Sequence, residues 1–341
     1  MKAALFVSPN VIEVKHDLPE PEFKEGILVK VKTTGFCATD VKTIKGLKKS
    51  NRPLPAAFGH EFSGVVVKTT INKYKEGDRV SVSPFCGCGH CVFCLGGEEQ
   101  LCKSKTFFSG GSTSDYVAVN LMLANKAGFV MPADVTWEEG AMTEPLACVL
   151  LSLRSTGFKP GESVLVLGAG FMGMLHVLLA KSWGASRVMV SEPSKFRRET
   201  AVKFGADVLD PTTGVDVGEW ARSLCGEGPN IIIAAAGTKP VADSAFKAAG
   251  LGTRIHLFGG MPTGTMIDVS ADDIHYKRIT LLGTSGFRSV DVQTAADMIK
   301  GHSIDLKPLV THRFSVEEAQ AAFEMAQQEN ALKVMMENAD F

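Results

Sequence analysis

Four of the eight cysteines in this 341-residue chain lie within one short segment. Cys88, Cys91, Cys94 and Cys102 follow the pattern C-x2-C-x2-C-x7-C. Four thiolates on one short loop match the closed, tetrahedral coordination of a structural zinc ion. The alternatives are a pair of disulfides or a redox loop, but reduced cysteines that bind metal suit an intracellular protein better. The spacing therefore predicts a loop folded around zinc.

Length and charge narrow the class of protein further. A chain of 341 residues suits two domains, and 45% hydrophobic residues can form a sizeable core. The net charge of −1, without a basic or acidic block, argues against binding to nucleic acid or to an anionic membrane. The start lacks the long apolar core of a signal peptide, and no apolar run is long enough for a membrane span. We therefore predict a cytoplasmic protein whose partners are small molecules.

The first 145 or so residues are rich in predicted strands. Residues 27–36 and 62–70 alternate or contain β-branched runs, with Gly, Pro and Asn between them. Helical periodicity becomes clear at 137–157, where we expect a single helix. At the other end of the chain, residues 315–328 predict an amphipathic helix capped by Ser315, followed by a short strand at 333–337.

The middle of the chain alternates short apolar strands with helical segments, a pattern typical of a doubly wound parallel sheet. Six strands suit a complete dinucleotide-binding domain. The predicted strands lie at residues 163–167, 187–192, 206–210, 230–237, 253–260 and 278–284.

A G-x-G-x-x-G sequence connects the first of these strands to a helix. It consists of Gly168, Ala169, Gly170, Phe171, Met172 and Gly173. Glycines at these positions permit a tight turn and a close approach of a pyrophosphate to the backbone, while the helix N-terminus faces the phosphate charge. The alternative is an ordinary glycine-rich turn, but the strand before it and the helix after it favour a nucleotide site.

An acidic residue ends the second strand of this region. Glu192 holds the position that accepts hydrogen bonds from the adenosine ribose and repels a 2′-phosphate, which favours NAD over NADP. Arg197 and Arg198 follow closely, and arginine is the residue that a 2′-phosphate would need. NAD is therefore the predicted cofactor, and NADP stays the alternative.

Further metal-type ligands lie far apart in the sequence, as a catalytic zinc site requires. They are Cys37, the pair His60 and Glu61, and Glu144. A lone buried cysteine and a histidine satisfied within the core are the commoner findings. The presence of a zinc loop and a nucleotide turn in the same chain favours the metal interpretation.

Together these motifs resemble those of the zinc-containing medium-chain dehydrogenases, over essentially the whole chain. GFCATD resembles the family's cysteine-ligand motif, GHEFSGVV its Gly-His-Glu motif and GAGFMG its nucleotide loop. The polyol branch, typified by sorbitol dehydrogenase, fits best. TEPLA has Glu144 where alcohol dehydrogenases carry a cysteine, and GFRS has Arg288 where polyol enzymes bind substrate.

The resemblance implies an α/β fold with a GroES-like, β-rich catalytic domain (1–146 and 287–341) and a Rossmann NAD-binding domain (147–286). It implies one structural and one catalytic zinc per chain. The catalytic zinc would be contacted by Cys37, His60 and Glu61, with Glu144 binding it directly or holding its water. Arg197 would pack near adenine. The family also implies a homotetramer or homodimer.

The expected reaction is hydride transfer between a polyol or secondary alcohol and NAD. Thr39 is placed to hydrogen-bond the substrate oxygen, although a helix-capping role is equally open. Lys42 stands where many relatives have a proton-relaying histidine. Threonine, 2,3-butanediol and a phosphorylated polyol are alternative substrates.

Two other classes of protein fit these residues less well. Quinone reductases of this type lack zinc, so the metal-type residues argue against an alkene reductase. A structural or redox-sensing NAD binder would have no need of Cys37, His60 and Glu144 together.

Overall fold

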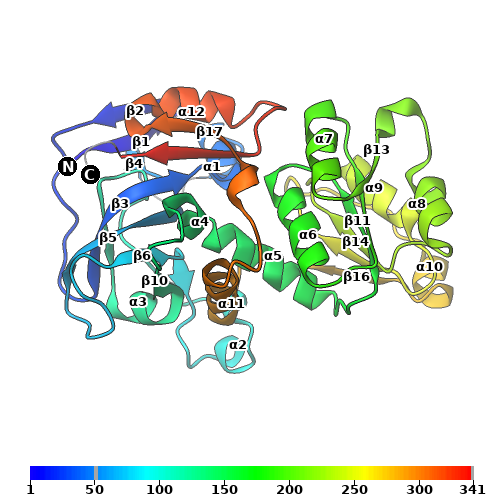
Figure 1. The fold of residues 1–341 in the computed structure, drawn as a ribbon, viewed down its shortest axis with the longest axis horizontal. Coiled ribbons are helices and arrows are strands. Elements are labelled where there is room, and N and C mark those ends of the chain that lie inside the picture. The colour runs from blue at the N-terminus through cyan, green and yellow to red at the C-terminus, as the bar shows by residue number, and fades with distance from the viewer. Residues whose placement is uncertain (50–52, 339–341) are drawn as a thin grey trace. The chain divides into compact units, whose positions relative to one another are not determined.

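The computed structural model describes residues 1–49 and 53–338 and divides into two compact units (Figure 1). Unit 1 is formed by Met1–Ala147 and Phe287–Phe341, and unit 2 by Cys148–Gly286. The middle of the chain thus forms a unit of its own, while the two ends of the chain share the other.

Unit 1 is built on a seven-stranded sheet to which both chain ends contribute. β3 pairs antiparallel with β5 on one side and with β18, near the C-terminus, on the other. The strand order is β10-β6-β5-β3-β18-β17, and β9 also pairs with β3. The bounds are β3 Ile27–Gly35, β5 Glu61–Thr69, β6 Arg79–Val82, β9 Tyr116–Val119, β10 Gly128–Val130, β17 Val310–Ser315 and β18 Lys333–Glu337. The expected strands near 27–36, 62–70 and 333–337 are confirmed.

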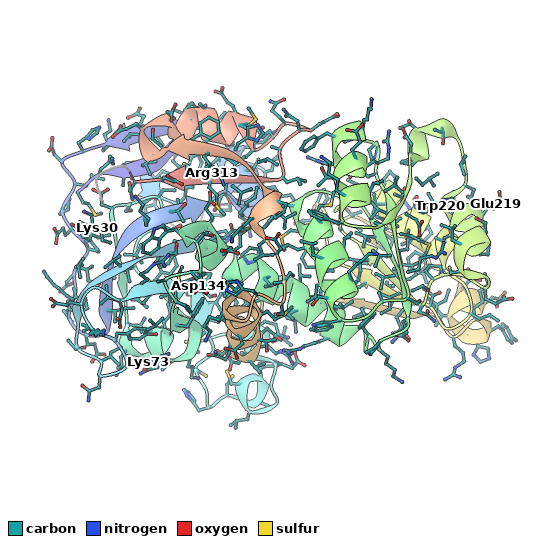
Figure 2. All side chains as sticks on the ribbon, in the orientation of Figure 1. Lys30, Lys73, Asp134, Glu219, Trp220 and Arg313 are labelled. Atoms are coloured by element: carbon teal, nitrogen blue, oxygen red, sulfur yellow. The ribbon has the colours of Figure 1, made fainter. Side chains whose placement is uncertain are left out.

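Smaller elements surround this sheet. β1, β2 and β4 form a second sheet, and the ribbon of β7 and β8 flanks the four-cysteine segment. These strands are β1 Ala3–Ser8, β2 Val11–Lys15, β4 Ala56–Ala57, β7 Phe85–Cys86 and β8 Thr106–Phe107. The helices are α1 Ala38–Ile44, α2 Val92–Leu95, α3 Leu121–Ala127, α4 Trp137–Ala141, α11 Ser289–Lys300 and α12 Ala319–Met325. Arg313 of β17, labelled in Figure 2, forms an ion pair of 2.6 Å with Glu138 of α4.

Two of the predicted helices differ from those in the structure. The single helix expected over 137–157 is wrong, because the structure has α4 and then α5, Thr143–Ser155, with a break at Met142. Pro145 explains the break, since in a continuous helix its ring would clash with the carbonyl of Ala141. Near the C-terminus, Ser315 and Glu318 form the expected capping box, but the first turn is a 3-10 turn that leads into α12.

Unit 2 contains the predicted doubly wound sheet. Six parallel strands run in the order β13-β12-β11-β14-β15-β16. Their bounds are β11 Ser163–Leu167, β12 Arg187–Ser191, β13 Asp207–Leu209, β14 Ile231–Ala234, β15 Arg254–Leu257 and β16 Thr280–Gly283. The helices are α6 Phe171–Ser182, α7 Lys195–Lys203, α8 Val217–Cys225, α9 Lys239–Ala248 and α10 Ala271–Tyr276. β11 and β14 are buried along their whole length, as strands covered on both faces must be. Trp220 of α8, labelled in Figure 2, packs against this core.

Among residues 1–49 and 53–338, no helix is both long and apolar enough to cross a membrane.

Candidate metal and nucleotide sites

The structure brings Cys37, His60 and Glu61 together in unit 1. One ligand atom from each lies within 4.8 Å of the other two. Cys37 is the N-cap of α1, and Glu61 begins β5 directly after His60. Thiolate sulfur, imidazole nitrogen and carboxylate oxygen form a donor set that suits zinc. The residues present therefore fit a zinc ion, although their role as ligands stays a prediction.

Asp40 orients this group from within α1. Its carboxylate accepts the Cys37 N–H at 3.2 Å and lies 3.3 Å from His60 Nδ1. Burial lowers the pKa of His60, but the negative charges of Asp40 and Cys37 outweigh burial, and the net pKa is raised well above its ordinary value. A carboxylate behind an imidazole fixes the ring and makes it a better metal donor. The spacing of Asp40 and His60 in the sequence gave no sign of this contact.

Glu61 has a cationic partner that the sequence analysis also missed. Lys333 of β18 forms an ion pair with the Glu61 carboxylate and donates to Phe36 O at 3.1 Å. Both side chains are almost fully buried, at 1% exposure each. A Cβ added at Gly35 would lie 2.4 Å from Glu61 Oε2 and 2.6 Å from Lys333 Cε, so only glycine leaves room for the pair. The available signal was a lysine at the start of a strand that continues with Val, Met and Met.

The four cysteines of the zinc loop also converge. Ligand atoms of Cys88, Cys91, Cys94 and Cys102 lie within 4.8 Å of one another. All eight cysteines of the chain lie in its described part, and no disulfide joins any of them. The segment folds as a lobe, defined here as residues 86–107, that contains α2 and is closed by the β7–β8 ribbon.

The electrostatics of the lobe favour a bound cation. The backbone N–H of His90 lowers the pKa of the Cys88 thiol to about 6. At Cys94 the N–H of Gly89 has the same effect, but burial and the three neighbouring thiols outweigh it and raise the pKa to about 12. Four adjacent sulfur atoms cannot all ionise without a compensating charge. A divalent metal would supply that charge, so these residues fit a structural zinc.

Arg288 lies at the start of α11, close to the lobe. Its guanidinium makes two bonds to the buried carboxylate of Asp291, at 2.7 and 3.0 Å. Hydrogen bonding to Asp291 raises the pKa of Arg288. The next residue, Ser289, donates to Glu99 of the lobe at 2.6 Å through its hydroxyl. Arg288 is thus held in an ion pair with Asp291.

In unit 2 the glycine turn connects β11 to α6. Gly168 has φ +97°, which disfavours side chains, and a Cβ at Gly173 would lie 2.0 Å from Gly168 O. Gly170 is the N-cap of α6, which begins at Phe171 and includes Met172. The turn therefore has the geometry in which backbone N–H groups and a helix N-terminus receive a pyrophosphate.

Glu192 lies directly after β12, beside this turn. Its Oε2 accepts the Ala169 N–H at 2.6 Å and its Oε1 accepts the Ser194 N–H at 2.9 Å. Arg198 is bound to Asp210 at 2.7 Å and to the carbonyl of Glu192 at 2.8 Å. Arg197 lies over the turn, because a Cβ at Gly170 would be 4.0 Å from its Nη1.

The remaining predicted residues lie near the ends of helices. Glu144 is half-buried in the first turn of α5 and lies outside the 4.8 Å group of Cys37. Thr39 is exposed on α1, and its backbone N–H donates to Cys37 Sγ at 3.4 Å. Cys37 caps the helix, so the helix-capping alternative for the Thr39 side chain is wrong. Lys42 is exposed in the last turn of α1.

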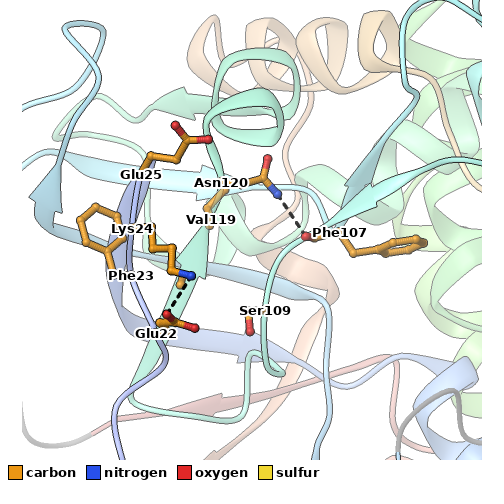
Figure 3. A pocket seen from close by; sticks show the side chains of 9 residues that line it. Glu22, Phe23, Lys24, Glu25, Phe107, Ser109, Val119 and Asn120 are labelled. Carbon is orange, nitrogen blue, oxygen red and sulfur yellow. Dashed lines mark hydrogen bonds and ion pairs between the residues drawn. The ribbon is translucent and has the colours of Figure 1, made fainter.

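A small pocket elsewhere in unit 1 contains none of these residues (Figure 3). It has a volume of about 190 Å³ and lies between residues 22–25 and the segment 118–120. Lys24 pairs with Glu22 at its rim at 3.0 Å, and Asn120 donates to Phe107 O at 3.3 Å. The predicted ligands therefore do not belong to this pocket.

A β-rich unit with two clusters of metal-type ligands and a doubly wound unit with a nucleotide turn define a zinc-binding oxidoreductase. Residues 24–127 match the alcohol dehydrogenase GroES-like domain, and residues 172–301 match the zinc-binding dehydrogenase domain. The chain belongs to the zinc-containing medium-chain dehydrogenase family and is similar to its polyol dehydrogenases.

Individual relatives cover nearly the whole chain. Sorbitol dehydrogenase of Ovis aries is 31% identical over 338 residues, which are 94% of this chain and 91% of the relative. L-threonine 3-dehydrogenase of Bacillus licheniformis is 29% identical, over 94% of this chain and 93% of the relative. Among solved structures, a Sinorhizobium meliloti protein described as a zinc-binding dehydrogenase bound to NADP is 27% identical, with a TM-score of 0.87 and 98% of each chain covered.

Proposed function

We propose that this chain is a zinc-dependent dehydrogenase that transfers hydride between a polyol, or another secondary alcohol, and NAD, giving a ketose or ketone. The observation that carries the proposal is the convergence of Cys37, His60 and Glu61 from separate segments on one point of unit 1. The relatives of the chain are dehydrogenases, and unit 2 has a dinucleotide turn. Both support a catalytic role for a metal held by these three residues.

In this proposal Cys37 and His60 hold the catalytic zinc, and Asp40 fixes the imidazole. Bound zinc supplies Lewis acidity, which lowers the pKa of an alcohol oxygen. Glu61, neutralised by Lys333, completes the group or stays beside it. Thr39 Oγ1 hydrogen-bonds the substrate hydroxyl, and Glu144 receives its proton or holds a water. The proton then leaves through Glu144 or past Lys42.

The substrate class rests on the relatives and on two residues. The sorbitol dehydrogenase relative supports a polyol, and the segments TEPLA with Glu144 and GFRS with Arg288 resemble those of polyol enzymes. Arg288 is already paired with Asp291, so we propose that it contacts a substrate hydroxyl through the edge that faces away from this carboxylate. L-threonine, 2,3-butanediol and a phosphorylated polyol stay the alternatives.

NAD is the proposed cofactor. Glu192 presents a carboxylate that is fixed by two backbone N–H groups at the end of β12, where the adenosine ribose binds in such folds. Arg198 is engaged with Asp210, which makes it a poor partner for a 2′-phosphate. Arg197 lies over the turn, where it would pack near adenine, and the NADP-bound relative keeps NADP as the alternative.

We propose a cytoplasmic homodimer or homotetramer. β16 is the outer strand of the sheet in unit 2, and Leu281 on it is exposed. An unpaired sheet edge with apolar side chains can pair with a second copy. Val92 and Leu95 on α2 are exposed as well and offer a second surface for a tetramer.

The test combines metal content with a substrate screen. We expect two zinc ions per chain, and NAD reduction with at least one polyol but slower reduction of NADP. Dialysis against a chelator should abolish turnover. Cys37→Ser should lose one zinc and all turnover while keeping the folded state. Full turnover in Cys37→Ser or after chelation would refute the proposal.

A further inference from the structure

Three buried side chains of unit 2 form a chain of hydrogen bonds. The chain runs from the glycine turn after β11 to the end of β16, an outer strand of the sheet. His176 Nε2 lies 2.9 Å from Ser152 Oγ, and the same hydroxyl lies 3.3 Å from His256 Nδ1. His256 Nε2 lies 3.1 Å from Thr284 Oγ1. Ser152, His176 and His256 have no solvent-exposed surface, so solvent does not interrupt the chain of hydrogen bonds. The sites described above use none of these side chains.

The inner end of this chain fixes the position of the first proton. His176 Nδ1 lies 2.8 Å from Met172 O, and a carbonyl oxygen only accepts, so Nδ1 carries the proton. Burial lowers the pKa of His176 to about 3, so the ring is neutral and Nε2 is an acceptor. The Ser152 hydroxyl must therefore donate to His176.

The remaining protons follow in sequence. Because its proton points to His176, Ser152 Oγ accepts from His256 Nδ1–H. Burial lowers the pKa of His256 to about 4, so this ring is also neutral and its Nε2 accepts the Thr284 hydroxyl proton. The hydroxyl proton of Thr284 is therefore donated to His256. Toward a ligand, Thr284 Oγ1 can act only as a hydrogen-bond acceptor.

Thr284 lies where the second half of a dinucleotide binds. It directly follows β16, at the carboxyl edge of the parallel sheet, and is half-buried. In a doubly wound sheet, ligands bind at this edge, and each half of the sheet takes one mononucleotide. The glycine turn and Glu192 belong to the half with β11 and β12, which leaves β14 to β16 for the nicotinamide half.

We propose that Thr284 Oγ1 is an acceptor that selects the carboxamide N–H group of nicotinamide and disfavours a carboxylate at the same ring position. A carboxamide brings two N–H donors, whereas the carboxylate of a nicotinic acid dinucleotide brings only lone pairs. The inference rests on the proposed dinucleotide function and adds to it a specificity residue, with Ser152 and His256 as positioning residues.

The first test separates the two halves of the cofactor. Calorimetric titrations of the holoenzyme would compare NAD with ADP-ribose, which lacks the nicotinamide ring. Thr284→Val should weaken NAD binding about 5- to 10-fold, the loss of one hydrogen bond, and leave ADP-ribose binding unchanged. Thr284→Ser keeps the hydroxyl and should bind NAD as the parent does. Equal effects of Thr284→Val on both ligands, or no effect on NAD, would overturn the proposal.

The second test addresses proton direction. The parent should prefer NAD over nicotinic acid adenine dinucleotide. In Ser152→Ala, His256 Nδ1 loses its acceptor, so the ring can place its proton on Nε2 and turn the Thr284 hydroxyl outward as a donor. The preference for NAD should then shrink several-fold, while ADP-ribose binding persists. An unchanged preference would refute the positioning role. If the parent binds none of the three ligands, the dinucleotide function itself fails.

Discussion

Lys333 stabilises Glu61 of the candidate metal group, although Lys333 is not itself a metal-type ligand. It neutralises the carboxylate of Glu61 inside the sheet of unit 1. Lys333→Met would leave that carboxylate buried without its charge partner, and we expect the free energy of unfolding to fall by about 3–5 kcal/mol. Urea denaturation of the metal-free protein measures the change, because a bound metal would mask it.

The control is a lysine on the same sheet. Lys68 is exposed on β5, and Lys68→Met should change the free energy of unfolding by less than about 0.5 kcal/mol. Replacing Glu61 by Gln in the Lys333→Met variant should restore part of the loss, since no buried charge then remains. Equal stabilities of Lys333→Met and Lys68→Met would contradict the assignment.

For single residues, the sequence predicted those features that depend on the spacing of neighbouring residues. The four loop cysteines and the glycine turn were predictable because the residues of each motif lie close together in the sequence. The pairing of Lys333 with Glu61 joins residues 272 positions apart, and that of Ser152 with His256 joins residues 104 apart. Such contacts depend on which strands become neighbours, and spacing carries no record of that.

At the scale of single elements, Asp40 of α1 takes part both in the capping of the helix and in the candidate metal group. Asp40→Asn keeps a side chain that can cap the helix but removes the charge behind His60. We expect zinc affinity at the Cys37 site to fall about 10- to 100-fold, measured by competition with a chromogenic chelator. Asp216→Asn, at the N-cap of α8, is the matched control and should leave zinc affinity unchanged. Unaltered affinity in Asp40→Asn would show that the contact does not tune the ligand.

The four-cysteine lobe gives a prediction of a different kind. Cys94→Ser should reduce zinc content from two ions per chain to one, because the closed site needs all four thiolates. Hydrogen exchange should then rise mainly in residues 86–107, whereas the Cys37 site keeps its metal. Cys225→Ser on α8, outside both clusters, is the control. Full zinc content in Cys94→Ser would refute a four-sulfur site.

The sequence contains a signal for the break between α4 and α5, but the apolar periodicity of the segment favoured a single helix. Pro145 already excluded a continuous helix through Ala141. The six strands of unit 2 were easier to place, because short apolar runs separated by glycine have few alternative interpretations. The strength of a local signal therefore decided which elements could be predicted.

At the scale of the whole molecule, unit 1 contains strands from both ends of the chain. β18 lies between β3 and β17, so residues near both termini complete one sheet, while the residues of unit 2 lie between them in the sequence. Periodicity predicted the strands but not this pairing, and resemblance to a family implied only that both chain ends belong to one domain. The pairing also brings Lys333 to Glu61 and thereby links the sheet's construction to the candidate metal group.

Acid should destabilise the folded molecule through its two buried histidines. Burial lowers the pKa of His176 to about 3 and that of His256 to about 4, against about 6.5 in an unfolded chain. Between about pH 6.5 and about pH 4 the unfolded chain binds protons that the folded chain does not, so the free energy of unfolding falls as the pH falls. Each histidine should contribute about 1.4 kcal/mol per pH unit in that window.

Urea denaturation of the metal-free protein, followed by the fluorescence of Trp183 and Trp220 in unit 2, measures this slope between about pH 6 and about pH 4.5. His176→Gln cannot take up the proton, so its slope should be shallower than that of the parent by about 1.4 kcal/mol per pH unit. His275→Gln, on the exposed face of α10, is the matched control. A slope in His176→Gln equal to that of the parent would mean that His176 is not held neutral by burial, and the proton order inferred along Ser152, His256 and Thr284 would lose its starting point.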